Sequence, residues 1–226
     1  MRRSHGVAIA AILAASAAFS VAMAGRIPER APIHWNLEGA IDGYGPKWIP
    51  IAVVPAFGAL FTALLAALPR IGPLEKNFER SSPAYGRLVV GVCLLFAVLG
   101  ALVQLAAAGV VVVLGRPLFF AAGAFVAWVG NSLGKLRRNH WVGIKTPWTL
   151  ESDAVWERTH RAGGKLMVAV GALVALSTLF APEWVGFALL VGGLLALVVW
   201  SFVYSRRAHG RLSDPGDGPR PREVPK

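Results

Sequence analysis

The sequence has few charged residues and a single cysteine. Only 15% of its 226 residues are Asp, Glu, Lys or Arg, whereas soluble domains carry about 25%. The lone Cys93 excludes an intrachain disulfide, and such a thiol is more typical of packing than of chemistry. The chain also lacks an H-E-x-x-H motif, a nucleophile elbow, a phosphate-binding glycine loop and a C-x-x-C pair. We therefore expect neither an enzyme nor a cofactor.

Long runs without charge fill much of the chain. Hydrophobic residues make up 55% of the sequence, and a helix needs roughly 20 apolar residues to cross the hydrocarbon layer of a membrane. Backbone groups in lipid must satisfy their own hydrogen bonds, so spans of this kind are helical. The sequence predicts an all-α integral membrane protein with six transmembrane helices, at about residues 6–24, 48–68, 88–112, 117–134, 165–182 and 185–204.

Positive charge is distributed unevenly between these spans. The chain has 23 Lys and Arg against 12 Asp and Glu, a formal net charge of +11. Nineteen of the 23 basic residues fall in the two tails and in the second and fourth loops. The positive-inside rule therefore places those segments, and both termini, in the cytoplasm. The basic excess indicates topology and some attraction to anionic lipid headgroups, and we expect no direct binding of nucleic acid.

The spans and loops divide the chain into four parts. Residues 1–68 form a two-span region with an extracytoplasmic loop, 69–87 a cytoplasmic loop, 88–205 a four-span region with the cytoplasmic loop 135–164, and 206–226 a disordered cytoplasmic tail rich in Pro and Gly. The first span has a second interpretation as a signal peptide, because Ala22 to Ala24 resembles a cleavage site. We favour a retained span, since the uncharged run of 18 residues from Gly6 to Met23 exceeds the usual apolar region of about 7–15 residues.

The extracytoplasmic loop holds the first group of candidate site residues. Apolar residues alternate from Ile33 to Leu37, which predicts a short strand or an extended stretch on the membrane. His34, Glu38 and Asp42 are plausible metal ligands, but their spacing fits no strong metal motif. The other interpretation is a folded loop whose polar groups satisfy one another.

The cytoplasmic loop holds the second group, between Asn139 and His160. Pro147 disfavours helix for the residue before it, so this loop is not helical throughout. Thr149 is a good N-cap, which predicts a short helix from about Leu150 to Arg161 that ends at Gly163 and Gly164. On that helix we expect Val155, Trp156 and Thr159 to face the membrane or the bundle, and Glu157 to pair with Arg161.

Polar groups inside the spans are scarce. Gln104 and Asn131 are the main ones, and no ionisable residue lies at mid-depth, which argues against an ion-coupled transporter. Asn131 could cap its helix or bond across helices. Glu157 and His160 have the helical spacing of a carboxylate-bridged metal site, but such sites need further carboxylates from other helices.

The polar motifs resemble a known family. Gly130 and Asn131, the stretch from Lys135 to Leu150, Val155 and Trp156, and Thr159 to Arg161 together resemble the SdpI family of bacterial membrane proteins. The outer motif, with Pro32, His34, Trp35, Asn36, Gly39, Asp42 and Lys47, is similar to a domain of unknown function that often precedes the SdpI region. In one position the chain departs from the family pattern, since Lys145 stands where Arg is usual. Lysine keeps the charge but loses the planar two-pronged bonding of guanidinium.

The resemblance implies a multi-pass protein of the cytoplasmic membrane. In the namesake of the family it implies resistance to a secreted peptide toxin and capture of a cytoplasmic transcriptional repressor. The residues expected to face a toxin are His34, Trp35, Asn36, Asp42 and Lys47, and those of the cytoplasmic motif are Asn131, Asn139, His140, Gly143, Lys145, Thr146, Pro147, Trp148, Trp156 and His160. Two alternatives stay open: a small transporter or exporter, and a membrane-bound metal protein that uses His34, or His140 and His160.

Overall fold

The computed structural model describes residues 2–36, 40–70, 75–110 and 114–213, and most of them are helical. The helices are α1 (Arg3–Met23), α2 (Val54–Ala67), α3 (Glu75–Ala107), α4 (Gly115–Leu133), α5 (Pro147–Glu151), α6 (Asp153–Phe180) and α7 (Glu183–Ser213). The strands are β1 (Arg30–Trp35) and β2 (Ile41–Pro46), and a π-helical turn, Ile49–Val53, leads into α2.

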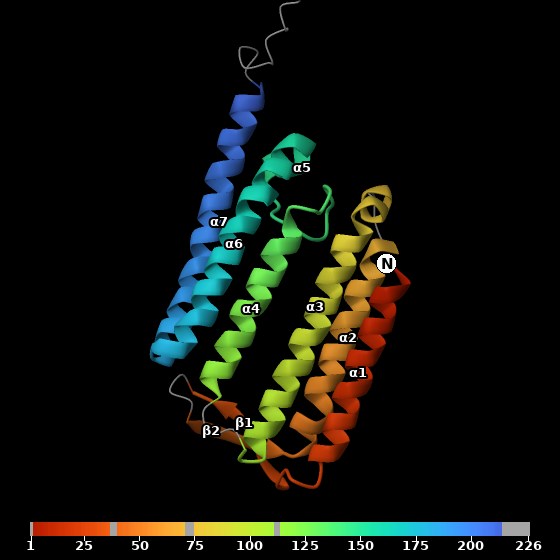
Figure 1. Ribbon diagram of the computed structural model, residues 1–226, viewed down its shortest axis with the longest axis vertical. Helices are drawn as coiled ribbons and strands as arrows, with labels where there is room; N and C mark the ends of the chain where they lie inside the picture. The colour runs from red at the N-terminus through yellow and green to blue at the C-terminus, as the bar shows by residue number, and fades with distance from the viewer. Residues whose placement is uncertain (1, 37–39, 71–74, 111–113, 214–226) are drawn as a thin grey trace, which may run out of the picture.

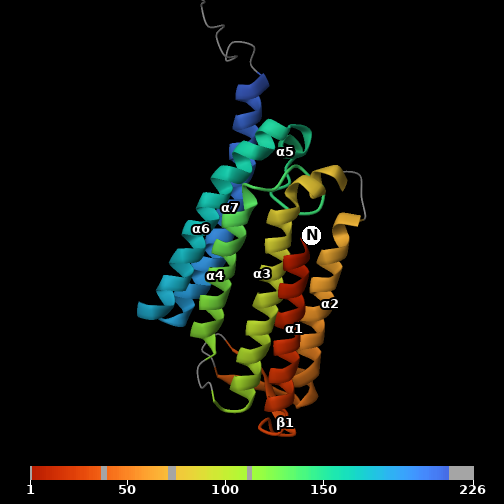
Figure 2. The same ribbon diagram turned by 45° about the vertical axis from the view of Figure 1, so that its right-hand side comes forward.

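The six long helices lie side by side in one bundle (Figures 1 and 2). Helices α1 and α2 pack on α3, helix α3 packs on α4, and α6 packs between α4 and α7. We call the end that holds β1 and β2 the hairpin end, and the end that holds residues 134–152 the loop end. The N-terminus and the last turns of α7 also lie at the loop end (Figure 1). Successive long helices therefore run in opposite directions.

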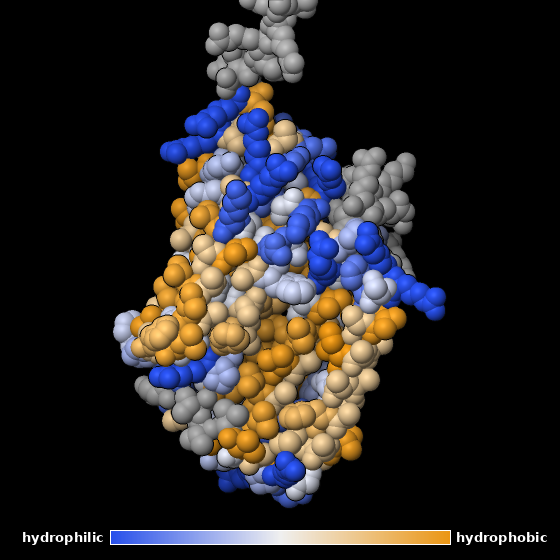
Figure 3. All heavy atoms as spheres, viewed as in Figure 1, coloured by the Kyte–Doolittle hydropathy of each residue, from blue (hydrophilic) through white to orange (hydrophobic). Residues whose placement is uncertain are grey.

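Five described helical segments are long and apolar enough to cross a membrane: Arg3–Met23, Ile49–Ala67, Pro83–Ala107, Asp153–Phe180 and Glu183–Leu212. Large apolar side chains such as Leu60, Leu173 and Val199 are exposed on them, as expected where the surroundings are lipid and not water. Apolar residues cover the middle of the face in Figure 3, with hydrophilic residues towards both ends. The chain is a mostly helical membrane protein, which confirms the predicted fold class. Helix α4, the predicted fourth span, packs along α6 but is not among the five.

Two long helices extend beyond their predicted boundaries. Helix α3 begins at Glu75, so much of the segment 69–87 continues the third long helix and is not a separate loop. Helix α7 continues to Ser213, so the predicted tail starts later than residue 206. Both extensions carry basic and polar residues. A prediction from apolar runs ends the span where these residues begin, although the helix continues through them.

The predicted helix from Leu150 to Arg161 is also wrong. Its N-cap is not Thr149: Thr146 caps α5, and Ser152, in extended conformation, separates α5 from α6 and caps α6 by accepting from the Val155 N–H. Gly163 and Gly164 do not end the helix, because α6 runs through them to Phe180. A Cβ on Gly164 would lie 2.6 Å from the carbonyl oxygen of Gly130. The glycine pair therefore serves the close approach of α4 and not a helix terminus.

The hairpin end carries the short strand predicted around Ile33. Strands β1 and β2 pair antiparallel, and Asn36 closes the turn by exchanging two hydrogen bonds of 2.9 Å with Ala40. The Asn36 side chain accepts the N–H of Ala40, while its own backbone N–H donates to the Ala40 carbonyl. Ala31 is fully buried against Met23, Ile27 and Ala107, so the hairpin is seated on α1 and α3.

Candidate functional site

Asn139 organises the turn at the start of the loop. Its side chain is 2% exposed and makes four hydrogen bonds to backbone. The Oδ1 atom accepts from the N–H groups of Trp141 (2.9 Å) and Val142 (2.8 Å). The Nδ2 atom donates to the carbonyls of Arg137 (2.9 Å) and Val142 (3.0 Å). An asparagine that satisfies its own neighbours in this way fixes a turn without regular secondary structure.

His160 joins the loop to α6. It is fully buried, and its Nε2 accepts the N–H of Ile144 at 2.9 Å. The other ring nitrogen, Nδ1, therefore carries the proton and donates to the carbonyl of Trp156 at 2.8 Å. Both nitrogens are satisfied in the neutral ring, so protonation would remove the bond to Ile144. Gly143 has a φ of +134°, and a Cβ there would lie 2.4 Å from His160 Nε2, so the position requires glycine.

Trp156 completes this contact. Its ring stacks on His160 with centroids 3.8 Å apart, and its Nε1 donates to the carbonyl of Leu136 at 2.8 Å. The side chain is 1% exposed. Trp156 thus reaches from α6 to Leu136 in the segment that follows α4. Val155, Trp156 and Thr159 were expected to face the membrane or the bundle, and their burial shows that they face the bundle.

Thr146 and Trp148 attach the loop to α7. Thr146 Oγ1 accepts the N–H of Thr149 and donates to Ser205 Oγ at 3.0 Å, while the Thr146 N–H donates to Thr149 Oγ1. Pro147 occupies the first turn of α5, where its missing N–H costs nothing. Trp148 packs edge-on against Phe202 of α7 with ring centroids 4.9 Å apart. The loop is therefore a folded unit held by α6 and α7.

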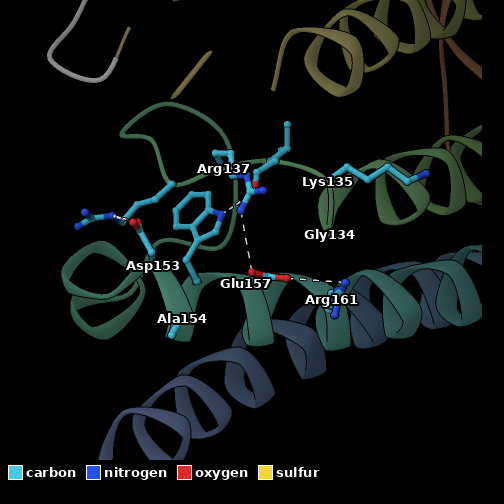
Figure 4. A pocket seen from close by; sticks show the side chains of 10 residues that line it. Gly134, Lys135, Arg137, Asp153, Ala154, Glu157 and Arg161 are labelled. Atoms are coloured by element: carbon cyan, nitrogen blue, oxygen red, sulfur yellow. Dashed lines mark hydrogen bonds and ion pairs between the residues drawn. The ribbon is translucent and has the colours of Figure 1, made fainter. Parts of the chain in front are cut away.

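Charged side chains line a pocket of about 530 Å³ beside this unit, which we call the basic pocket. Arg138 Nε donates to Asp153 Oδ1 at 2.6 Å, and its Nη1 donates to the carbonyl of Leu150 at 2.5 Å. Glu157 lies between two arginines (Figure 4), 4.0 Å from Arg137 and 3.7 Å from Arg161. The predicted pair of Glu157 and Arg161 is thus confirmed. Exposed pairs of this kind add little stability, so their main property is the charge they present.

The candidate residues at the hairpin end form two ion pairs. His34 Nδ1 lies 2.5 Å from Asp42 Oδ1 across the hairpin. Lys47 Nζ lies 2.5 Å from Glu29 Oε1, beside the first residue of β1. Trp35 is half-buried at the end of β1, next to the turn residue Asn36. These residues lie on or beside β1 and β2, at the end of the molecule opposite the loop (Figure 1).

The structure brings most of the predicted cytoplasmic motif together, but not all of it. Seven of its residues build the folded unit: Asn139, Gly143, Thr146, Pro147, Trp148, Trp156 and His160. His140 and Lys145 are exposed on its rim. Lys145 Nζ donates to the carbonyls of His140 and Trp141 over long distances of 3.4 and 3.5 Å. Asn131 is exposed on α4. Within the described residues its side chain neither caps a helix nor forms a hydrogen bond to another helix.

Three contributing residues were not predicted. Arg138 ties the loop to Asp153 of α6, Ser205 of α7 accepts from Thr146, and Gly164 sets the distance between α4 and α6. Among these, only Gly164 has a signal in the sequence, since it directly precedes the predicted fifth span while Gly130 lies in the fourth. In the ranges that the structure describes, no group of three His, Cys, Asp or Glu is placed to hold a metal ion. Glu38, a ligand of the metal interpretation, lies outside those ranges.

These features define a class: a helical membrane protein with a small hairpin at one end and a folded, basic loop at the other. Comparison with known proteins is more specific. The model of the SdpI/YfhL protein family matches residues 135–205, and that of a domain of unknown function, DUF1648, matches residues 11–59. The chain is 28% identical over 189 residues to the immunity protein SdpI of Bacillus subtilis (strain 168), covering 81% of this chain and 87% of that protein. No solved structure matches. The resemblance to the SdpI family is thereby confirmed.

Proposed function

We propose that the protein is an immunity protein of the SdpI type, which protects a bacterium from a secreted antimicrobial peptide toxin. One observation carries this proposal: the similarity to immunity protein SdpI extends over 81% of the chain. The family match from residue 135 to 205 also begins where the folded loop begins. A binding function fits the architecture, since the loop residues are used to hold the fold together and the polar surfaces lie at the two ends. We accordingly propose that the protein is not an enzyme.

The proposal includes a topology in the cytoplasmic membrane. We infer six crossings, with α4 as the fourth, both termini inside and the hairpin outside. Three observations support it. Helix α4 packs along α6 and antiparallel to α3. Both ends of the described chain lie at the loop end (Figure 1). Nineteen of 23 basic residues fall in segments that this topology places inside.

In this arrangement the hairpin is the surface that an extracellular toxin meets first. It offers an exposed His34–Asp42 pair, the half-buried Trp35 and the Lys47–Glu29 pair. Aromatic and paired charged groups on a two-stranded scaffold suit recognition of a peptide. Two hydrogen bonds between Asn36 and Ala40 join the ends of the two strands on this surface.

The loop end is the surface that a cytoplasmic repressor would meet. Trp141 is 40% exposed beside the exposed His140 and Lys145, and the basic pocket lies at the same end of the molecule. An exposed tryptophan bordered by cations fits a partner with an apolar residue and acidic neighbours. Because residues 139–152 are attached to α6 and α7, any toxin-dependent change in these helices would reach this surface.

Survival of a toxin-sensitive bacterium tests the proposal. We expect cells that express the protein to survive exposure to the cognate peptide. The double variant His34→Ala/Asp42→Ala should lower protection at least about tenfold, since one lost charged interaction in an interface is worth roughly 1.4 kcal/mol or more. The matched control is Glu151→Ala, an exposed acidic residue at the opposite end. Membrane content of each variant is measured in parallel. Unchanged survival across a panel of membrane-active peptides would contradict immunity.

A further inference from the structure

A second hollow lies between α4 and α6. It adjoins the basic pocket and lies further from the loop end. It has a volume of about 300 Å³ and is lined in part by Asn131 and Lys135 of α4 and by Arg161 and Lys165 of α6. We call it the interhelical pocket. Its floor is one of the places where the two helices approach each other through glycine. A Cβ on Gly130 would lie 2.6 Å from the carbonyl oxygen of Gly164, and the reverse distance is also 2.6 Å.

The charge of this pocket is not compensated from within. Three cations and no acidic residue line it. In the described part of the chain, Lys135 and Lys165 form no ion pair, and Arg161 has only Glu157, 3.7 Å away and outside the lining. Figure 4 shows Arg161 turned towards Glu157 and Lys135 extending away along α4. Asn131 adds an amide that can donate a hydrogen bond. The pocket thus presents three positive charges and a neutral donor, which suits a phosphate group.

The same stripe of α4 continues into an apolar groove. Ala124, Trp128, Asn131 and Lys135 are spaced by four, three and four residues, so they share one face of the helix. Ala124 and Trp128 line a hollow of about 230 Å³ between α3 and α4, whose other lining residues include Leu94 and Phe120. Eleven residues of helix cover roughly 16 Å. A ligand on this stripe therefore meets an anion site at one end and an apolar groove along the rest.

We propose that this stripe binds an anionic phospholipid, with the headgroup phosphate at Lys135, Arg161 and Lys165 and an acyl chain in the groove beside Trp128. Basic pockets between membrane helices on the cytoplasmic side are suited to such headgroups. Lysine side chains at the ends of apolar helices lie at headgroup depth, where phosphate is the abundant anion. The binding needs no toxin and no repressor, so it goes beyond the immunity proposed above.

Native mass spectrometry of the purified full chain tests the proposal. The protein in mild detergent is mixed with equal amounts of phosphatidylglycerol and phosphatidylcholine that carry identical acyl chains. We expect phosphatidylglycerol to be retained preferentially. Lys135→Gln/Lys165→Gln should lower that preference about tenfold. Arg206→Gln/Arg207→Gln, which removes the same charge from an exposed part of α7, should leave it unchanged. Equal retention of the two lipids, or equal loss in the two double variants, would overturn a defined site.

A third variant distinguishes a lipid from free phosphate. Ala124 is exposed, so Ala124→Phe fills the groove without entering the core. We expect it to lower retention of phosphatidylglycerol several-fold, and we expect added inorganic phosphate not to displace the lipid. Displacement by phosphate together with no effect of Ala124→Phe would show a free anion site and overturn the lipid assignment. Thermal unfolding of every variant establishes that the comparisons are between folded proteins.

Discussion

Replacing Gly171 with alanine is expected to destabilise the protein by about 3 kcal/mol, at the upper end of the usual cost of overpacking. A Cβ at this position would lie 2.4 Å from the carbonyl oxygen of Gly123 and 2.5 Å from the amide nitrogen of Ala127. Both atoms belong to the backbone of α4, so no side-chain rotation can relieve the clash. The two helices must move apart. Thermal unfolding in detergent should show a fall in Tm of roughly 6–12 °C, given about 2–4 °C per kcal/mol for a chain of this size.

The reason for so large an effect is that α4 and α6 meet twice through glycine. Gly123 faces Gly171, and Gly130 faces Gly164, and in each pair a Cβ on either glycine would lie within 2.6 Å of the other's carbonyl oxygen. On each helix the two glycines are seven residues apart, which is two turns. Close backbone approach replaces the hydrophobic effect as the source of association inside a membrane, because lipid is as apolar as the helices. Moving α4 and α6 apart at one glycine pair therefore also weakens the contact at the other pair.

Gly192→Ala is the matched control. Gly192 lies inside α7, and a Cβ there has nothing within 4 Å. Alanine also has the higher helix propensity, so this variant should be neutral or slightly stabilising. A similar fall in Tm for Gly171→Ala and Gly192→Ala would mean that the glycine contacts between α4 and α6 do not determine stability.

Trp156→Ala is expected to have the second large effect, a loss of about 3–5 kcal/mol, as for other buried tryptophans. The side chain is 1% exposed, stacks on His160 and donates to the Leu136 carbonyl. Its removal leaves a cavity and an unpaired Leu136 carbonyl, and the His160 ring loses the aromatic ring stacked on it. We expect the loop to open, and trypsin to cut after Arg137 or Arg138 faster than in the unaltered protein. Thermal unfolding and timed proteolysis measure the two effects.

Two further variants separate packing from hydrogen bonding in this contact. Trp156→Phe keeps an aromatic ring beside His160 and loses the bond to Leu136, so its cost should be lower, on the order of 1–3 kcal/mol. Trp141→Ala removes a tryptophan that is 40% exposed, and it should change Tm little. If Trp156→Ala behaved like Trp141→Ala, the loop would not depend on the stack with His160.

The membrane class could be predicted from the sequence because it depends on composition. Uncharged runs locate the helices, and the alternation around Ile33 predicts the first strand. Helical spacing places Val155, Trp156 and Thr159 on one face, and the structure shows that this face is buried in the bundle. Helix ends were harder. Gly163 and Gly164 resemble a terminus by local propensity, yet the contact with Gly130 keeps them inside α6.

The loop shows what local patterns could and could not give. Thr146 followed by Pro147 is a helix-start signal in the sequence, and it marks the N-cap of α5 correctly where Thr149 does not. In contrast, Thr146 bonds to Ser205, 59 residues away, and Asn139 acts through four backbone bonds that depend on the final turn. No spacing rule gives such partners, so the candidate residues were found without their roles.

Cysteine labelling of intact cells tests the central claim most directly, namely that the hairpin and the folded loop lie on opposite sides of the membrane. Cys93 is buried and is the single cysteine, so Cys93→Ser provides a background without thiols. Into it are placed Ile41→Cys, at an exposed residue of β2, and His140→Cys, at an exposed residue of the loop. A membrane-impermeant maleimide should label Ile41→Cys in intact cells and His140→Cys only after permeabilisation. Labelling of both positions in intact cells, or of His140→Cys alone, would contradict the account.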